Sequence, residues 1–518
     1  RMMQRNYLFV KRLQKTIFIF ALFMFLTENL RAESNTQKII FPRAFAVAID
    51  DMGWNEGGSL AETGGGWRVG IRRDFDVRDY RPIIEVGKAV GVRFQGLFVL
   101  AEMDRLNVCA KYPTTTQHGE KWDNDDNIDP TQIEVMNYIK DNAAYLEFGL
   151  HGVGHEYWID GKRTRAEWYN IENDQPWPEV DMRNHIKCYK EIMAQYGWTP
   201  DNGQSFPKSF VPCCYSFYWN PQGDYSTGKI MFEAGVRYVN TQFDYIPELN
   251  PPIEFGGGWD HGVLVINRLN YGNDWYETGK LPVEKIEKYE TDVIETHWAN
   301  WLATDDFLQP TLNQKWIEFF KNIQAHPNHY LAKNTKQLYS QWLYKRFTSV
   351  AESTIGEVTI NNQQMPDQAY SPYFLGNMVL AIKLADGEHV SEAQLNGQPI
   401  SAYFEDAGYG FIYLPPLEQK NYKFIYKIGQ KLMDNIVYND GTYNVYRTEL
   451  TRKNMIIDLE MYGTQIVKVK CRKPTSISTS NPNLKVLSKR YEIPYEMLFL
   501  EIYGNDMQGE CGKVIIDF

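Results

Sequence analysis

The stretch Ala44-Phe45-Ala46-Val47-Ala48-Ile49-Asp50-Asp51 decides how this chain of 518 residues is interpreted. An apolar run of strand-forming residues ends there in two adjacent carboxylates. Neighbouring side chains of a strand point to opposite faces, but both acids can reach one cleft where the chain turns at the strand's C-terminal end. Two adjacent acids are unfavourable unless they have a use, and a metal ion beside a catalytic base would supply one. We therefore expect the rest of the chain to provide further metal ligands.

Residues 38–345 alternate strand-like and helix-like segments. After 47–49, the strand-like runs are 92–100, 146–150, 209–212, 237–241, 263–266 and 292–296. This rhythm predicts an α/β fold, a barrel or a sheet built from parallel strands. In α/β barrels the chemistry gathers at the C-terminal ends of the strands, so residues that follow these runs are the candidates for function.

The pattern changes after Arg346. Short strand-like runs follow one another, separated by turn signals such as Asp386-Gly387 and Asn396-Gly397, and side chains alternate well in 423–426 and 465–470. We interpret this part as one or two antiparallel β-sandwich modules, over residues 346–430 and 431–518.

The N-terminus has the pattern of a secretory signal peptide over residues 1–32. Basic residues precede an apolar stretch at 17–26, and Leu30-Arg31-Ala32 offers a small residue for cleavage. The apolar stretch is too short to span a bilayer, although a retained membrane anchor is the alternative. We expect an exported protein, periplasmic, at the cell surface or secreted, with no stable membrane span after cleavage.

Charge and cysteine content exclude some classes of protein. The formal net charge of −11 argues against a nucleic-acid partner, because such proteins usually display a basic face. The six cysteines include no CxxC spacing, which argues against structural zinc. Cys471 and Cys511 lie in the same region and could pair in an oxidising compartment.

Two histidines follow the strand-like run at 146–150, in His151-Gly152-Val153-Gly154-His155. At this spacing two imidazoles on one face of a helical turn can share a metal ion, and the glycines suggest a tight loop that clears room. Two histidines and one carboxylate leave one position on a zinc-like ion open for water, which is the layout of a catalytic site. The second carboxylate can then act as a general base, and another histidine can donate a proton to the leaving group.

These motifs resemble those of the NodB-type polysaccharide deacetylases, carbohydrate esterase family 4. Ala48-Ile49-Asp50-Asp51-Met52-Gly53 is similar to the family's first motif, which implies that Asp50 is the base and Asp51 a metal ligand. His151 and His155 match the ligands of its second motif, and Ile294-Glu295-Thr296-His297 resembles its last motif, which implies that His297 is the catalytic acid. The resemblance also implies a distorted (β/α)7 barrel and a divalent metal, for which the donor set favours zinc.

The chain departs from the family pattern in several places. Gly152 replaces a hydroxyl residue, and Met52 displaces the expected glycine by one position. The third motif, Arg-x-Pro-Tyr, is only echoed in 210–215, where the arginine that orients the base is absent. Arg268 could replace that arginine from another strand; the alternative is an ordinary surface arginine. Asp244 is a weak match to the aspartate that supports the catalytic acid.

The sequence therefore predicts an exported, metal-dependent hydrolase that removes acetyl groups from a glycan or oligosaccharide. Tyr215 and Trp219 are candidates for lining the sugar cleft, where an aromatic face can cover a pyranose ring. Two alternatives stay open: a barrel that has lost activity and acts as a carbohydrate-binding or scaffolding protein, and a metal-dependent amidase or esterase that acts on a non-acetyl group.

Overall fold

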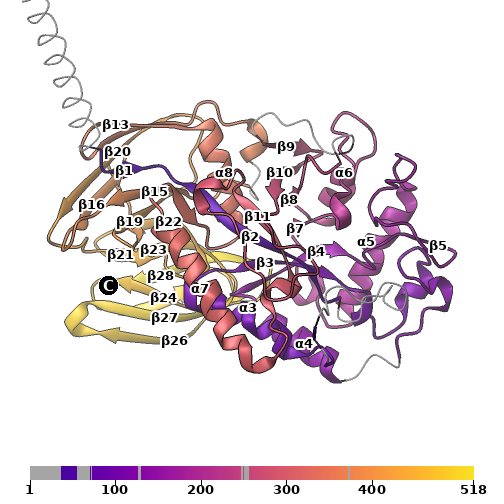
Figure 1. Cartoon of the computed structure of the whole chain (residues 1–518). Coiled ribbons are helices and arrows are strands. Elements are labelled where there is room, and N and C mark those ends of the chain that lie inside the picture. Colours follow the sequence, from indigo (N-terminus) through magenta and orange to yellow (C-terminus); the bar gives the residue numbers. More distant parts are fainter. Residues whose placement is uncertain are drawn as a thin grey trace, which may run out of the picture.

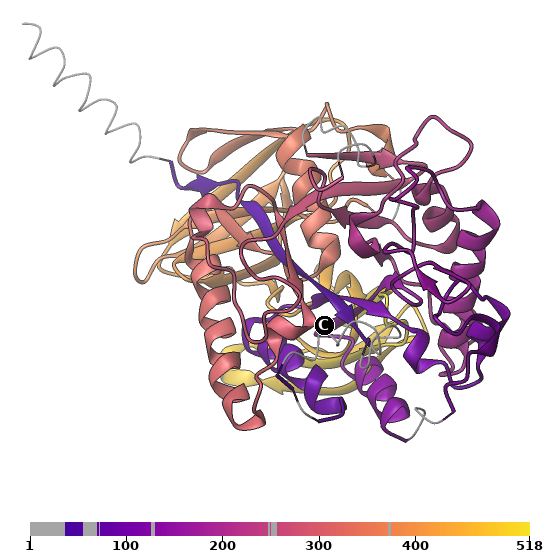
Figure 2. The same cartoon turned by 45° about the vertical axis from the view of Figure 1, so that its right-hand side comes forward.

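The computed structural model describes residues 37–54, 70–71, 73–125, 130–246, 249, 256–370 and 374–518. The predicted signal peptide, residues 1–32, lies outside them. Within the described part, a barrel formed by the first half of the chain packs against antiparallel sheets formed by the second half (Figures 1 and 2).

Seven parallel strands close into a barrel. In spatial order they are β11 (Val293–His297), β10 (Val263–Leu269), β8 (Tyr238–Thr241), β7 (Ser209–Phe210), β4 (Leu146–Gly152), β3 (Phe94–Val99) and β2 (Arg43–Met52). Every neighbouring pair is parallel, and pairing of β11 with β2 completes the closure. Each strand-like run of the first half of the sequence corresponds to one of these strands, so the prediction of a parallel α/β barrel is confirmed.

The regular alternation of strands and helices is only partial. The described residues contain six α-helices: α3 (Val77–Val90), α4 (Pro130–Asp141), α5 (Glu179–Ala194), α6 (Thr227–Ala234), α7 (Gln309–Ala325) and α8 (Thr335–Phe347). Among the described residues, no α-helix connects β8 to β10 or β10 to β11. Between β8 and β10 lies a short strand, β9 (Gly257–Asp260), which pairs with β10. The barrel is therefore distorted where these loops replace helices.

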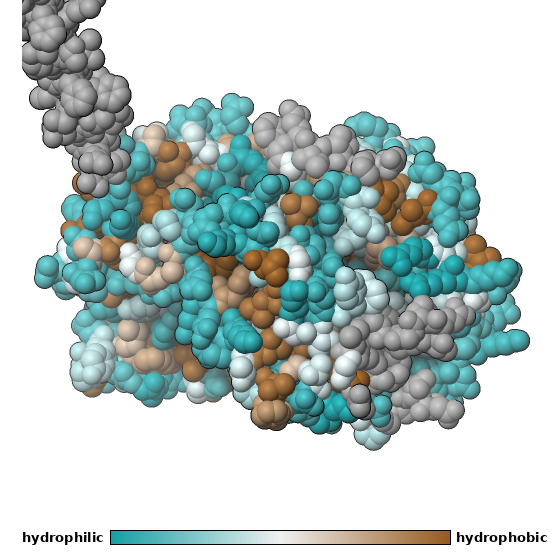
Figure 3. All heavy atoms as spheres, viewed as in Figure 1, coloured by the Kyte–Doolittle hydropathy of each residue, from teal (hydrophilic) through white to brown (hydrophobic). Residues whose placement is uncertain are grey.

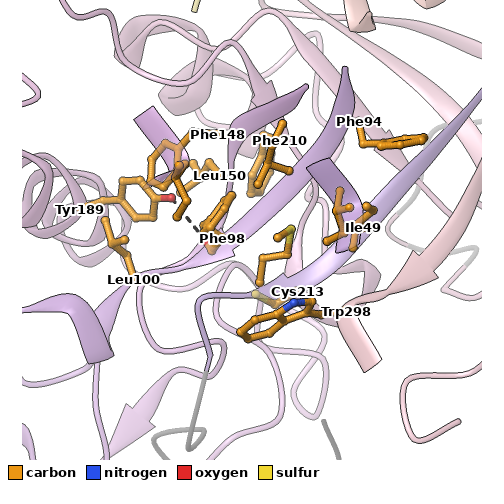
Figure 4. Close-up of a cluster of buried hydrophobic side chains, with 14 of the residues drawn as sticks. Ile49, Phe94, Phe98, Leu100, Phe148, Leu150, Tyr189, Phe210, Cys213 and Trp298 are labelled. Carbon is orange, nitrogen blue, oxygen red and sulfur yellow. Dashed lines mark hydrogen bonds between the residues drawn. The ribbon is translucent and has the colours of Figure 1, made fainter. Parts of the chain in front are cut away.

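Alternate side chains of the barrel strands face two different cores. In β2, Phe45, Val47 and Ile49 pack in the cluster shared with the surrounding helices, part of which is shown in Figure 4. In that view the hydroxyl of Tyr189 on α5 donates to the carbonyl of Phe98, at 3.4 Å. Ala48 lies on the opposite face of β2, in the second core. Period-two burial on both faces explains why the strands are apolar throughout.

Helix α8 connects the barrel strands to the second core, which the barrel shares with the C-terminal sheets. The hydroxyl of Tyr339 accepts a hydrogen bond from Asn240 of β8 at 3.3 Å, and Gln341 donates to the carbonyl of Pro42, just before β2, at 2.9 Å. Tyr339 belongs to the buried cluster that also contains Ala48 and residues of the C-terminal sheets. Because α8 lies near the N-terminal end of β2, the C-terminal ends of the strands are left for the site.

The described residues of the C-terminal half form three sheets, the largest of which also includes β1 from the segment before the barrel. The largest has the order β1-β15-β19-β18-β21-β24-β27-β26, another has β13-β14-β20-β16-β17, and the third has β22-β23-β28-β25. The strands of these sheets are β1 (Ile39–Ile40), β13 (Ser349–Thr354), β14 (Glu357–Asn361), β15 (Met378–Lys383), β16 (His389–Leu395), β17 (Gln398–Pro399), β18 (Ala402–Asp406), β19 (Tyr409–Leu414), β20 (Asn421–Gly429), β21 (Ile436–Tyr438), β22 (Asn444–Leu450), β23 (Asn454–Met461), β24 (Gly463–Lys470), β25 (Ser476–Thr479), β26 (Leu484–Glu492), β27 (Met497–Gly504) and β28 (Glu510–Asp517). Within these sheets, pairing is antiparallel except between β18 and β21, which are parallel. Because β18 precedes residue 430 and β21 follows it, the largest sheet contains strands from both predicted modules.

A buried carboxylate connects the two halves. Glu460 of β23 accepts hydrogen bonds from Asn444 at 3.1 Å and Tyr462 at 3.2 Å, and its other oxygen lies 3.4 Å from the ammonium of Lys208 in the barrel. Burial would raise the pKa of Glu460, but the charges of Lys208 and Lys336 outweigh it and lower the pKa to about 2. The interface thus contains a fully paired charge rather than apolar contact alone.

Cys471 and Cys511 do not form the predicted disulfide. Cys471 is buried after β24 of the largest sheet, whereas Cys511 is exposed on β28 of the four-stranded sheet, and both are free thiols. Proximity in the sequence could not show that the two cysteines belong to different sheets.

The face seen in Figure 3 is mostly hydrophilic, with hydrophobic residues scattered over it. Among the described residues, no helix has the length and apolar character needed to cross a membrane.

Candidate active site

A cavity of about 740 Å³ opens where the barrel strands end. Asp50 and Asp51 reach it from β2, His151 from β4, Arg268 from β10 and His297 from β11. Tyr215, which follows β7, also lines it. The strand order therefore brings together groups that are far apart in the sequence, as expected at the C-terminal ends of parallel strands.

A bulge turns both adjacent acids of β2 into this cavity. The register between β2 and β3 shifts between Ile49 and Met52, and Asp51 has a φ of 65°, in the left-handed region. Bulges of this kind re-aim side chains and occur next to active sites. Without the bulge, the strict alternation of a strand would have placed Asp50 and Asp51 on opposite faces.

Asp51 lies between the two histidines. Its Oδ1 atom is 3.3 Å from Nε2 of His151 and 3.5 Å from Nε2 of His155. The Nδ1 atom of His151 is 2.8 Å from the carbonyl oxygen of Val211, which can only accept, so Nδ1 carries a proton and Nε2 is the nitrogen that faces Asp51. A metal-binding imidazole is usually oriented by such a bond to its other nitrogen.

The histidine pair does not come from a helical turn. His151 belongs to β4, and His155 lies in the loop beyond it with a φ of 67°, where its ring stacks on Trp54 at a centroid distance of 4.3 Å. The expectation of a helical arrangement was therefore wrong. The bend of the loop, rather than helical periodicity, directs both Nε2 atoms toward Asp51.

The intervening glycines make room for protein groups. A Cβ atom at Gly152 would collide with the carboxylate of Glu167, and one at Gly154 with the carbonyl of Thr115. Glu167 is fully buried; it accepts a hydrogen bond from the amide of Val153 and lies 2.7 Å from Nδ1 of His185. This packing accounts for the glycine at position 152.

Buried groups that could hold a metal ion are present among the described residues. Two sets bring their donor atoms within 4.8 Å of one another: His151, His155 and Cys213, and Asp50, Glu295 and His297. The thiol of Cys213 donates to the carbonyl of His151 at 3.3 Å, and burial raises its pKa well above the ordinary value. Burial also raises the pKa of Asp51, but its contacts with His151 and His155 outweigh this effect and lower the pKa below its ordinary value. His151, His155 and Asp51 thus form a donor set that fits a divalent metal.

Asp50 forms a buried ion pair with Arg268. The guanidinium donates to both carboxylate oxygens, at 2.9 and 2.5 Å, and Arg268 is only 1% exposed. Burial raises the pKa of Asp50, but the charge and hydrogen bonds of Arg268 outweigh it, so the pKa lies below its ordinary value. The alternative of a surface arginine is therefore wrong, and a guanidinium from β10 occupies the side of Asp50.

Glu295 extends this network to His297. Its Oε1 atom accepts a hydrogen bond from the hydroxyl of Tyr215 at 2.7 Å and lies 3.3 Å from Nε2 of His297, while Oε2 is 3.3 Å from Arg268. Glu295 thus occupies the position beside His297 that Asp244 was expected to fill. Sequence alternation could have indicated this, because Glu295 and His297 are two residues apart on one strand and so share a face.

Two of the predicted residues lie away from the cavity. Asp244 is exposed and does not line it, although the neighbouring Tyr245 does. Trp219 packs partly buried against the barrel core, with its ring beside Gly258. The cavity wall contains other residues that the sequence did not single out: Trp54, Arg163, Arg165, Trp275 and Tyr276.

Comparison of the chain with protein-family models gives no match, and a search of curated proteins gives none either.

Proposed function

We propose that this chain is an exported metal-dependent hydrolase that removes acetyl groups from a carbohydrate. The observation that carries the proposal is one cavity in which a His-His-Asp donor set lies beside a second carboxylate, Asp50, held by a buried arginine. The proposed metal is zinc, because two imidazoles and one carboxylate are typical of catalytic zinc sites. The motif resemblance points to the same reaction.

The proposed division of labour follows from the contacts. A bound divalent metal would lower the pKa of a coordinated water and polarise the acetyl carbonyl. Asp50 would accept the proton of the attacking water; its lowered pKa keeps it ionised, and Arg268 fixes its orientation through two hydrogen bonds. His297 would donate a proton to the departing amine or alkoxide, and Glu295, whose Oε1 atom lies 3.3 Å from its Nε2 atom, would orient the ring.

The same geometry addresses the alternative of an inactive barrel. The missing arginine of the third motif was the reason to consider lost activity, and Arg268 supplies a guanidinium to Asp50 from another strand. The alternative of a non-acetyl amidase or esterase shares the same site and differs only in the acyl group that it accepts.

Release of acetate from acetylated glycans tests the proposal. The mature protein is incubated with chitin, peptidoglycan and acetylated xylan fragments, with and without a chelator and after re-addition of zinc. We expect acetate from at least one substrate, lost with the chelator and restored by zinc. The Asp50→Asn variant is the matched control, since it preserves shape and should retain the metal. Binding of these glycans with no acetate from any of them would instead favour a carbohydrate-binding protein.

A further inference from the structure

One wall of the cavity is formed by a cationic stretch, Gly161-Lys162-Arg163-Thr164-Arg165. The stretch includes β6 (Lys162–Arg163), which pairs with β5 (Trp158–Ile159) in a hairpin beyond the two histidines. Arg163 and Arg165 line the cavity, and Lys162 is exposed nearby on the hairpin. Three cations within four positions stand out in a chain whose net charge is −11.

The cations of this wall differ in whether a carboxylate already pairs with them. Arg163 donates to the fully buried Glu156, at 3.0 and 2.9 Å. Arg268, deeper in the cavity, is paired with Asp50 and Glu295. Arg165 is exposed, and within the described ranges no carboxylate oxygen lies within 4.0 Å of its guanidinium. Arg165 is therefore available to bind an anion that enters the cavity.

The backbone and a neighbouring ring position Arg165. Its φ of 80° lies in the left-handed region, which non-glycine residues adopt infrequently. Its carbonyl oxygen accepts a hydrogen bond from Sγ of Cys214 at 2.9 Å, and the side chain of Tyr245 lies next to its guanidinium. The residue is thus held at the cavity wall by its own main chain.

Exposed aromatic rings lie around the same cavity. Tyr245, Trp275 and Tyr276 line it and are 54%, 45% and 49% exposed. Exposed rings of this kind offer faces on which sugar rings can stack, while an arginine fork matches a carboxylate with two parallel hydrogen bonds. Exposed rings, together with an arginine that is hydrogen-bonded to Tyr245 but has no carboxylate within 4.0 Å among the described residues, suit a glycan that is both cyclic and acidic.

We propose that the substrate is an acidic glycan, and that Arg165 binds the carboxylate of a uronic acid unit next to the acetylated sugar. This inference rests on the proposed deacetylation and names its substrate class. A neutral glycan would leave Arg165 hydrated, whereas an acidic neighbour would form a charge-assisted pair at the mouth of the cavity. A sulfate or phosphate ester is the competing anion, and carboxylate is favoured because its planar shape matches the guanidinium.

Matched oligosaccharides test the inference. Hyaluronan oligosaccharides and chitin oligosaccharides present the same N-acetylglucosamine with acidic or neutral neighbours, and glucuronic-acid-branched and unbranched acetylated xylan oligosaccharides form the corresponding O-acetyl pair. We measure kcat/KM for acetate release and, by titration calorimetry, the affinity of the zinc-loaded protein for each. Arg165→Gln should lower the ratio of acidic over neutral kcat/KM about 10-fold or more, since hydrogen bonds to charged groups contribute on that scale. Added salt should lower the same ratio in the wild type.

Controls separate this inference from the proposed function. Lys321→Gln removes an exposed cation of α7 that does not line the cavity and should leave the ratio unchanged. Arg165→Lys keeps the charge but not the fork, so partial recovery is expected. Equal kcat/KM and equal affinity for the acidic and the neutral oligosaccharides would overturn the inference but would leave the proposed deacetylation intact. Preference for a sulfated oligosaccharide over the uronic acid would overturn the carboxylate assignment. If no acetate is released at all, the proposed function fails, and the affinities alone still decide whether the cavity selects acidic glycans.

Discussion

Replacement of Arg268 by methionine should destabilise the protein and nearly abolish its activity. Arg268 and Asp50 are both buried and are joined by two hydrogen bonds, and a carboxylate oxygen of Glu295 lies 3.3 Å from the same guanidinium. Methionine fills much of the space but leaves two carboxylates without a cation. Removing one partner of a buried ion pair typically lowers the free energy of unfolding by about 3–5 kcal/mol. Activity should fall at least about 100-fold, because Asp50 loses the charge that keeps it ionised and the fork that orients it.

The variant Asp50→Asn/Arg268→Met separates this cause from a simple loss of packing. Removing the second charge should recover part of the lost stability, because the uncompensated carboxylate is the main source of the cost. Arg268→Lys keeps a cation without the fork, so its stability should be intermediate. The measurements are urea unfolding, acetate release and zinc content, which should stay near one ion per chain because the ligand set is untouched. The reasoning would be refuted if the free energy of unfolding of Arg268→Met were within about 1 kcal/mol of the wild-type value and the double variant were no more stable than Arg268→Met.

Three further predictions follow from the site and the interface. Asp51→Ala should lose stoichiometric zinc by elemental analysis, whereas Asp50→Asn should keep it and lose turnover; zinc retained in Asp51→Ala would contradict the ligand set. Gly154→Ala should lower stability by about 1–3 kcal/mol and weaken zinc binding, because its Cβ would collide with the carbonyl of Thr115 beside the histidine loop; unchanged melting and zinc affinity would argue against this packing. Glu460 has a folded pKa of about 2 against an ordinary 4.5, so its stabilising effect is present above pH 4.5 and is lost as the pH falls toward 2. Glu460→Gln should therefore lower the free energy of unfolding by about 3 kcal/mol at neutral pH. The variant should also lose less stability than the wild type between pH 4.5 and 2, as measured by chemical unfolding at several pH values.

Much of the barrel could be predicted because its signals are local. The seven strands are largely apolar runs, and four of them, β2, β4, β10 and β11, contain a residue that lines the cavity. Long-range relations could not be predicted in the same way. Arg268 reaches Asp50 only because β10 and β2 both flank β11. Trp219, a candidate for sugar stacking by its residue type, instead packs, partly buried, against the barrel core.

The sequence by itself determined the order of strands, the adjacent acids at the end of β2 and the spacing of the two histidines. Tertiary structure decided how these parts were used. A bulge with a left-handed Asp51 turned both acids to one side, and a loop rather than a helical turn directed His155 toward Asp51. Closure of the barrel brought an arginine from β10 to Asp50 of β2 and to Glu295 of β11. The physical reason is that alternation and apolarity are properties of neighbouring residues, whereas the pairing of buried charges depends on which strands the closed sheet makes adjacent.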